Sequence, residues 1–168
     1  MNPSVVVGDI TELDVDAIVN TANPSLLGGG GVDGAIHKTA GPGLLHECKS
    51  LNGCEVGKAK LTAGYNLPSR FVIHAVGPVW DDTNQASSDL RECYRSCFRL
   101  AALYKVRSIS FPAISTGAYG FPKEPAAYIA VAETLRFLRL HPDIKILFCC
   151  FTEEDAEIYR KILNQPSP

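Results

Sequence analysis

Short apolar runs alternate with amphipathic segments along most of the chain. Apolar residues stand next to one another in Val5–Val7, Ala17–Val19 and most of Ile144–Phe151, which is typical of strands buried on both faces. From Leu90 to Ala101 they recur every three or four positions, as in a helix that buries one face. This alternation of strand and helix patterns predicts a three-layer α/β domain with a largely parallel central sheet.

Turn and capping residues give the predicted elements their boundaries. Strands are expected at Val5–Val7, Ala17–Val19, Lys60–Gly64, Phe71–Val76, Ser108–Pro112 and Ile144–Phe151. Helices are expected from Val32 to the Gly41-Pro42-Gly43 break, at Leu44–Leu51, from an Asp89 cap with Glu92 as its partner, at Pro125–Leu140, and from Thr152 to near Leu163. No linker or repeat interrupts this order, so residues 1–168 are expected to form one domain with a frayed tail at about 164–168.

Composition narrows the range of partners. The 168 residues are 46% hydrophobic and 20% charged, with a formal net charge of −2, which is typical of a folded soluble domain. Lysine and arginine form no dense cluster, which argues against a broad nucleic-acid surface but not against a nucleotide in a pocket. The apolar runs are too short to span a bilayer, and the N-terminus does not resemble a signal peptide, so a cytoplasmic protein without a membrane partner is expected.

Cysteine spacing gives no sign of a metal site. The chain has six cysteines and no Cys-x-x-Cys pair, so the usual zinc and thioredoxin-like spacings are missing. The cysteines lie in apolar surroundings of predicted helices and strands, where a thiol behaves as a small hydrophobe. They are expected to be buried and reduced: Cys48, Cys54, Cys93, Cys97, Cys149 and Cys150.

Two loops of small residues carry the candidate chemistry. Five of the seven residues from Gly28 to Gly34 are glycine, with Asp33 among them and Asn20 and Asn23 just before. Ala113–Pro122 is the second loop, and each loop follows a predicted strand, so both belong at the ligand-binding edge of the sheet. Neither loop contains lysine or arginine, so backbone N–H groups would have to hold a phosphate. Asp33 would repel that phosphate and is expected, with Asn23, to face sugar hydroxyls.

Simpler explanations remain open for several of these residues. The glycines can form a flexible turn, and Asp33 can serve only as a helix cap. Asp9 is common turn chemistry after a strand, and Phe151 can belong to the core. Trp80 either borders the site or packs beside it. Structural roles are expected for the histidines His37, His46 and His74.

The two loops together resemble those of the macrodomain family, in particular its MacroD-type branch. The resemblance rests on the segment from Asn20 to His37 and on Ser115–Pro122, and it extends from about Val5 to about Leu163. It implies a mixed sheet of about six strands between helices, with ADP-ribose bound in a cleft at the strand ends. The implied ligand-binding residues are Asp9, Ile10, Ala22, Gly30, Gly31, Val32, Ser115, Thr116, Gly117, Ala118, Tyr119 and Phe151.

The resemblance also implies how the ligand lies. Asp9, Ile10 and Phe151 would contact adenine, and the two loops would clasp the diphosphate. The implied catalytic residues at the distal ribose are Asn23 and Asp33, with Tyr119 closing over the sugar.

The resemblance implies a metal-independent hydrolase without a cofactor. It would remove mono-ADP-ribose from acidic protein side chains and deacetylate O-acetyl-ADP-ribose, through a water positioned by Asp33 and Asn23. Asp33 would either deprotonate this water or only orient it while the substrate diphosphate assists. A module that binds ADP-ribose without cleaving it is the alternative, and a nucleic-acid partner is disfavoured by the net charge. A monomer is expected.

Overall fold

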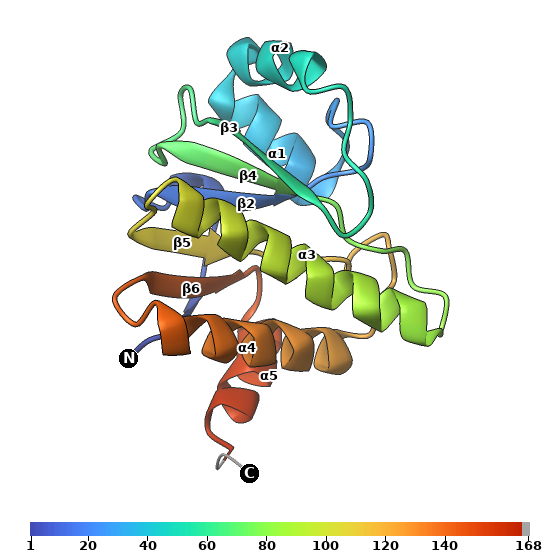
Figure 1. Ribbon diagram of the computed structural model, residues 1–168, viewed down its shortest axis with the longest axis vertical. Coiled ribbons are helices and arrows are strands. Elements are labelled where there is room, and N and C mark those ends of the chain that lie inside the picture. Colours follow the sequence, from blue (N-terminus) through green and yellow to red (C-terminus); the bar gives the residue numbers. More distant parts are fainter. Residues whose placement is uncertain (166–168) are drawn as a thin grey trace.

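A six-stranded mixed sheet organises residues 1–165, which are those that the computed structural model describes (Figure 1). Its order is β1-β6-β5-β2-β4-β3, and only β3 runs antiparallel to its neighbour. The strands are β1 (Ser4–Val7), β2 (Ala17–Thr21), β3 (Ala59–Ala63), β4 (Phe71–Ala75), β5 (Ser108–Phe111) and β6 (Lys145–Cys150). The predicted largely parallel sheet is confirmed, while residues 166–168 of the expected frayed tail at about 164–168 lie outside the described residues.

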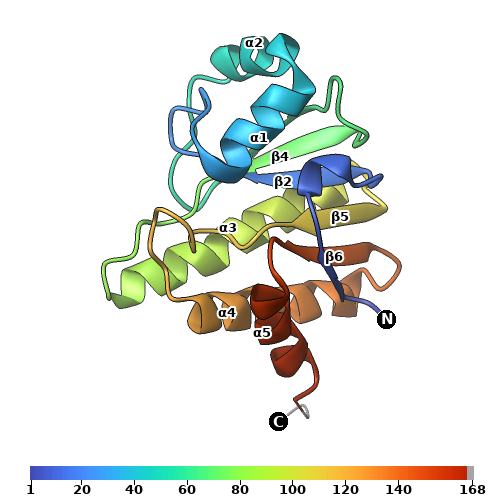
Figure 2. The ribbon, with the colours of Figure 1, turned by 180° about the vertical axis from the view of Figure 1, so that it is seen from behind.

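Helices cover both faces of the sheet, as the three-layer prediction requires. Long helices α3 and α4 lie across one face (Figure 1), and α1 and α2 cover the β2–β4 part of the other (Figure 2). Helix α5 packs against α4, β1 and β6. The helices are α1 (Gly31–Ala40), α2 (Pro42–Ser50), α3 (Asn84–Leu103), α4 (Lys123–Leu140) and α5 (Glu153–Leu163).

Alternation along β2 divides the core in two. Ala17 and Val19 join the apolar cluster under α3 and α4, whereas Ile18 joins the cluster under α1 and α2. Successive side chains of a strand point to opposite faces, so Asn20 lies on the α1 side together with Ile18. Asn20 and His74 are register partners in the parallel pair of β2 and β4. The polar side chains of Asn20 and His74 therefore lie next to each other on the face of the sheet that α1 covers.

One predicted helix start is wrong by more than two residues. Helix α3 begins at Asn84, and its cap is Thr83, whose hydroxyl accepts a hydrogen bond from the Ala86 backbone N–H. Asp89, predicted as the cap, lies inside the helix and accepts from Gln85 Nε2 over 2.8 Å. Several residues before Leu90 are able to cap a helix. Because Ala86 is buried against the core, the helix includes it and begins earlier in the sequence than predicted.

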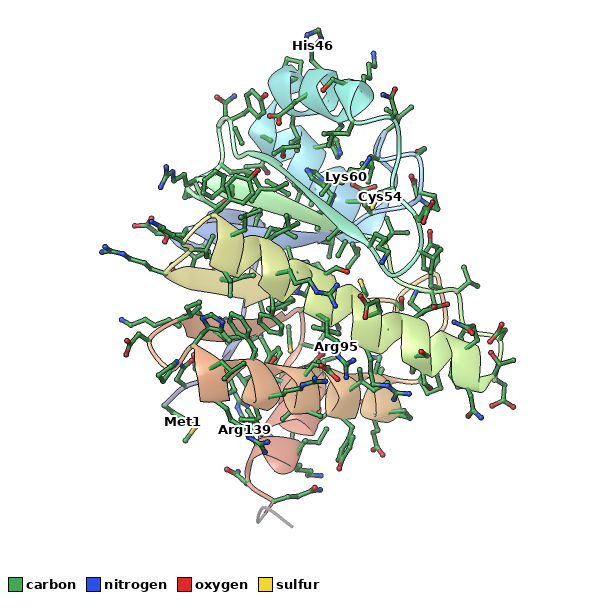
Figure 3. The ribbon with its side chains drawn as sticks, viewed as in Figure 1. Met1, His46, Cys54, Lys60, Arg95 and Arg139 are labelled. Carbon is green, nitrogen blue, oxygen red and sulfur yellow. The ribbon has the colours of Figure 1, made fainter. Side chains whose placement is uncertain are left out.

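One ion pair between a half-buried arginine and a buried glutamate joins α3 to α4. Arg95 of α3 (Figure 3) donates two hydrogen bonds, of 2.8 and 3.0 Å, to Glu133 of α4, whose exposed fraction is only 6%. A bidentate contact of this kind fixes orientation as well as distance. It holds α4 against α3, and α4 begins beside the cavity described below.

The cysteine prediction is confirmed, since all six are buried free thiols. Within residues 1–165 no group of three or more histidine, cysteine, aspartate or glutamate side chains is arranged to hold a metal ion. None of the helices in this range has the length and apolar character needed to cross a membrane.

Candidate active site

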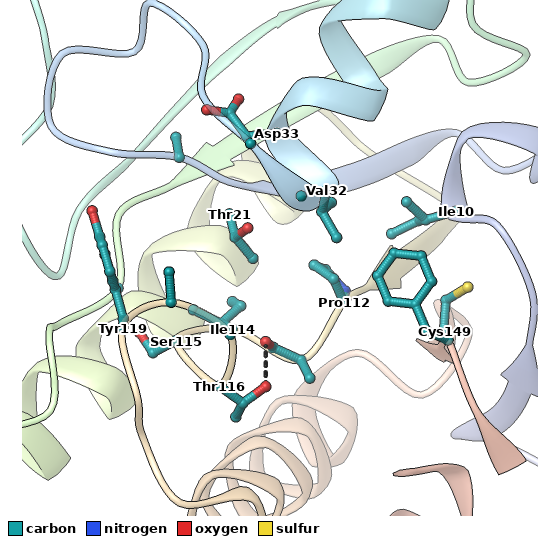
Figure 4. A pocket seen from close by; sticks show the side chains of 18 of the residues that line it. Ile10, Thr21, Val32, Asp33, Pro112, Ile114, Ser115, Thr116, Tyr119 and Cys149 are labelled. Carbon is teal, nitrogen blue, oxygen red and sulfur yellow. Dashed lines mark hydrogen bonds between the residues drawn. The ribbon is translucent and has the colours of Figure 1, made fainter. Parts of the chain in front are cut away.

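A cavity of about 520 Å³ opens at the carboxyl ends of the parallel strands (Figure 4). Its walls come from the segments that follow β1, β2, β5 and β6, and therefore from both loops singled out in the sequence. This size suits a small-molecule ligand. Its principal lining residues are Ile10, Thr21, Ala22, Asn23, Gly29, Gly30, Gly31, Val32, Asp33, Gly77, Pro112, Ala113, Ile114, Ser115, Thr116, Gly117, Ala118, Tyr119, Lys123, Cys149, Cys150, Phe151 and Asp155.

The cavity brings together nearly all the residues that the sequence analysis nominated. Every one of them lines it except Asp9. Asp9 is exposed, and its Oδ1 accepts hydrogen bonds of 2.9 Å from the Thr11 N–H and 2.7 Å from the Thr11 hydroxyl. Asp9 thus caps a short 3-10 helix at Ile10–Glu12, and its neighbour Ile10 reaches the cavity.

The first wall is the start of α1. Gly30 is its cap residue and provides no side-chain hydrogen bond, so the first backbone N–H groups of the helix are free to meet a ligand. Gly31 and Val32 line the cavity here, and Gly31 has a φ of +58°. A Cβ atom on Gly34 would lie 2.6 Å from the Gly29 carbonyl oxygen. Glycine at position 34 therefore lets the loop fold tightly onto its own helix.

Asp33 is buried at one end of the cavity. Its Oδ1 accepts a 2.8 Å hydrogen bond from Asn20 Nδ2, and His37 Nε2 lies 3.4 Å from the same oxygen. Burial raises the pKa of Asp33, while the Asn20 hydrogen bond and the nearby His37 oppose that rise. Because Oδ1 is engaged by Asn20, Oδ2 is the oxygen available to a ligand or a water.

Asn23 borders the same space as Asp33. A Cβ atom on Gly29 would lie 3.2 Å from Asp33 Oδ2 and 3.6 Å from Asn23 Nδ2, so both polar atoms face the position beside Gly29. Asn23 also holds its own loop, because its Nδ2 donates to the Gly28 carbonyl and its Oδ1 accepts from Ser25. One N–H of the Asn23 amide remains for a ligand.

The second wall is the loop after β5. Ser115 adopts a φ of +67°, and its buried hydroxyl has no hydrogen-bond partner among the described residues. The Thr116 hydroxyl donates to the Ala113 carbonyl over 3.0 Å (Figure 4), so its proton serves the loop itself. The Phe121 N–H donates to the Ser115 carbonyl and closes the loop. Backbone groups, together with Ser115, are what this wall offers to a ligand.

Two aromatic side chains, Phe151 and Tyr119, line the cavity. Phe151 is 65% exposed and is therefore not part of the core. Tyr119, half-buried, lies at the Asp33 end, and its carbonyl accepts from the Trp80 N–H over 2.8 Å. Trp80 packs on Phe121 with ring centroids 4.6 Å apart and supports the loop from outside the cavity.

Sequence reasoning missed two groups of residues. Lys123, the only cation among the described lining residues, pairs with Asp155 over 2.7 Å. Lys123 directly follows the second loop, and this position at the start of α4 was the sequence feature that could have identified it as a lining residue. Asn20 was noticed only as a polar residue near the loop, and its partner His74 was assigned a structural role, because their contact depends on strand register.

Comparisons with known proteins agree with this geometry. The Macro domain family model matches residues 19–130. The chain is 52% identical to ADP-ribose glycohydrolase MACROD2 of Xenopus laevis, over 96% of this chain but only 40% of that protein. It is 53% identical to O-acetyl-ADP-ribose deacetylase of Klebsiella pneumoniae, over 97% of both.

Among solved structures, the Trypanosoma brucei macrodomain in complex with ADP-ribose superposes with a TM-score of 0.89 at 48% identity, covering 95% of this chain and 69% of that one. The Oceanobacillus iheyensis macrodomain with ADP has a TM-score of 0.89 at 45% identity, over 95% of this chain and 88% of that one. The mixed six-stranded sheet with flanking helices is the fold that the resemblance implied. The chain belongs to the Macro domain family.

Proposed function

We propose that this chain is a hydrolase that releases ADP-ribose from mono-ADP-ribosylated acidic side chains and deacetylates O-acetyl-ADP-ribose. The observation that carries the proposal is the pair Asp33 Oδ2 and Asn23 Nδ2, which border one space at the end of a nucleotide-sized cavity. Relatives named ADP-ribose glycohydrolase and O-acetyl-ADP-ribose deacetylase support it.

The distribution of groups along the cavity suggests how ADP-ribose lies. Phe151 and Ile10 offer apolar surface for adenine at one end. The free N–H groups at the start of α1 and the Ser115–Ala118 backbone are suited to a diphosphate. The distal ribose then reaches Asp33, Asn23 and Tyr119. This orientation keeps the carboxylate of Asp33 away from the phosphates.

Hydrolysis of either ester needs a water beside the distal ribose. Asp33 Oδ2 can accept a hydrogen bond from that water, and the remaining N–H of Asn23 can bind the ribose or the water. The water supplies hydroxyl to one fragment and a proton to the other. Asp33 takes the proton directly, or orients the water while a phosphate oxygen of the substrate takes it. Because its pKa is raised, Asp33 is a stronger base than an ordinary aspartate, which favours the first of these two roles.

The test uses a protein that carries mono-ADP-ribose on glutamate, and free ADP-ribose is measured over time. We expect turnover by the unaltered chain, and a loss of at least about 100-fold in Asp33→Ala. Asp143→Ala is the matched control, because Asp143 is an exposed aspartate in the turn before β6, at the opposite edge of the sheet.

Calorimetry with ADP-ribose separates binding from turnover. Tight binding without product release by the unaltered chain would favour a non-catalytic reader. Equal rates for Asp33→Ala and the unaltered chain would remove Asp33 from the mechanism.

A further inference from the structure

Behind Asp33, a buried line of polar side chains crosses the sheet. Asn20 of β2, His74 of β4 and Thr62 of β3 each have an exposed fraction of 0%. All three lie on the side of the sheet that α1 and α2 cover. None of them lines the cavity, so no ligand there would touch them.

Short contacts join these residues to Asp33 in order. Asn20 Nδ2 lies 2.8 Å from Asp33 Oδ1 and 3.1 Å from His74 Nδ1. On the other side of the ring, His74 Nε2 lies 2.9 Å from Thr62 Oγ1 and 3.8 Å from Cys48 Sγ. The line thus runs from Asp33 through one amide and one imidazole to the edge strand.

The donor and acceptor pattern fixes the direction of these bonds. An ionised carboxylate only accepts hydrogen bonds, and the Asn20 amide nitrogen only donates. With Nδ2 facing both neighbours, His74 Nδ1 must be the unprotonated nitrogen, and the ring proton sits on Nε2, facing Thr62. Burial keeps the ring neutral, since it lowers the pKa of His74 to about 3.

The Asn20 amide has an alternative orientation that His74 opposes. Its Oδ1 is buried and has no hydrogen-bond partner among the described residues, and such an unpaired group destabilises the folded state. If the amide turned over, this oxygen would face the Asp33 carboxylate, which repels it, and His74 Nδ1, which repels it as long as the ring proton is on Nε2. The unpaired oxygen is therefore tolerated because two acceptors require the nitrogen side.

We propose that His74 is a positioning residue for Asp33: by accepting one N–H of Asn20, it holds the amide so that the other N–H donates to the Asp33 carboxylate. This inference rests on the proposed function only in that Asp33 acts on the ester substrates. His74 touches no ligand and works through Asn20. It keeps Asp33 Oδ1 engaged, which leaves Oδ2 to face the cavity.

The role predicts a change in pH dependence. Four groups face Asp33 from the elements packed around it: His37 on α1, Cys48 on α2, Asn20 on β2 and, through Asn20, His74 on β4. The hydrogen bond from Asn20 lowers the pKa of Asp33 against the effect of burial. When that bond is weakened, the carboxylate form is lost at a higher pH, and the acid limb of the rate profile moves upward.

His74→Phe and His74→Asn provide the test. Phenylalanine keeps the ring but removes the acceptor, whereas the asparagine side-chain oxygen lies near the position of Nδ1. For His74→Phe we expect kcat at pH 7 to fall about tenfold or more, the acid limb to move upward, and KM to change less than about twofold. His74→Asn should regain most of the rate. His46→Phe, on the outer surface of α2 (Figure 3), is the matched control.

Loss of thermal stability with an unmoved pH profile, or equal defects in both variants, would overturn the inference. Nitrogen NMR of the unaltered full chain gives a second measurement that does not depend on how the variants fold. We expect a neutral His74 with its proton on Nε2 from pH 5 to 8, and a proton on Nδ1 would contradict the proposal. An unaltered chain that releases no ADP-ribose would instead reject the proposed function, and the NMR result would still decide the tautomer.

Discussion

Gly77 and Ser115 approach so closely that any side chain at position 77 would have to displace Ser115 and Ile114. A Cβ atom there would overlap the Ser115 hydroxyl and lie 2.7 Å from Ile114 Cγ2. Gly77 follows β4, whereas Ser115 belongs to the loop after β5, and both line the cavity. The left-handed backbone of Ser115, with a φ of +67°, therefore depends on the space left by a glycine from another strand.

Gly77→Ala should displace the second loop and weaken ADP-ribose binding by about tenfold or more, since an overpacked site typically loses 1–3 kcal/mol. Calorimetry measures the affinity, and thermal unfolding should show a lowered melting temperature. Gly8→Ala is the control for stability, because a Cβ atom at Gly8 meets nothing within 4 Å. Equal melting temperatures for the two variants would contradict the packing argument.

Most of the fold could be predicted because it follows from local pattern. Each of the predicted strands is present within about two residues, and the Thr152 cap of α5 accepts the expected hydrogen bond from the Asp155 N–H. The Asp89 cap failed because several neighbouring residues cap equally well, and only tertiary burial of Ala86 chooses between them. Local chemistry identifies a helix more reliably than it identifies the first residue.

The candidate site also has parts that could be predicted from the sequence and parts that could not. Its loops could be predicted, since glycine runs and small polar residues are visible in one stretch of sequence. The Asn20–His74 contact could not, because it joins positions 54 residues apart through the register of two strands. Likewise, Lys123 becomes part of the cavity only when α4 and α5 meet, where it pairs with Asp155.

Asp33→Asn should unfold at a higher temperature than the unaltered chain while losing hydrolysis. Burial raises the pKa of Asp33, so ionising it near neutral pH destabilises the folded state relative to the unfolded one. Asparagine removes that charge and can still accept from Asn20 Nδ2. Differential scanning calorimetry at pH 7 and at pH 4 checks the sign, because the advantage should shrink as the native aspartate becomes protonated. An unchanged or lowered melting temperature at pH 7 would contradict it.

Stability should fall in mild acid because of His74. Its pKa is lowered from 6.5 to about 3 in the folded state, chiefly by burial. Below about pH 6.5, His74 binds a proton in the unfolded chain but not in the folded chain. The free energy of unfolding therefore falls by up to about 1.4 kcal/mol for each pH unit. Urea titrations from pH 7 to pH 4 measure this slope. His74→Asn should show a shallower slope, and parallel curves for the two proteins would exclude His74 as the cause.

Lys123 and Asp155 should affect ligand affinity in opposite directions. Lys123 is the single cation among the described lining residues, and Asp155 partly neutralises it. Lys123→Met should weaken ADP binding by about three- to tenfold because it removes the single cation of the described lining, and Asp155→Asn should strengthen binding. Calorimetry at two salt concentrations checks this, because the effect of each variant should diminish with screening. Changes of the same sign would contradict the electrostatic explanation.

The carboxylate and the cavity wall opposite it are anchored in separate parts of the molecule. Asp33 is held by side chains buried between β2 and β4, whereas the second loop is seated over Gly77. Substitutions at Asn20 or His74 would change the orientation and the pKa of the Asp33 carboxylate and leave the two loops unchanged. A descendant of this chain could in that way lose turnover and keep its ligand, with both loop motifs unchanged. The residues at positions 20 and 74, which no ligand in the cavity touches, would then distinguish a macrodomain that hydrolyses its ligand from one that only binds it.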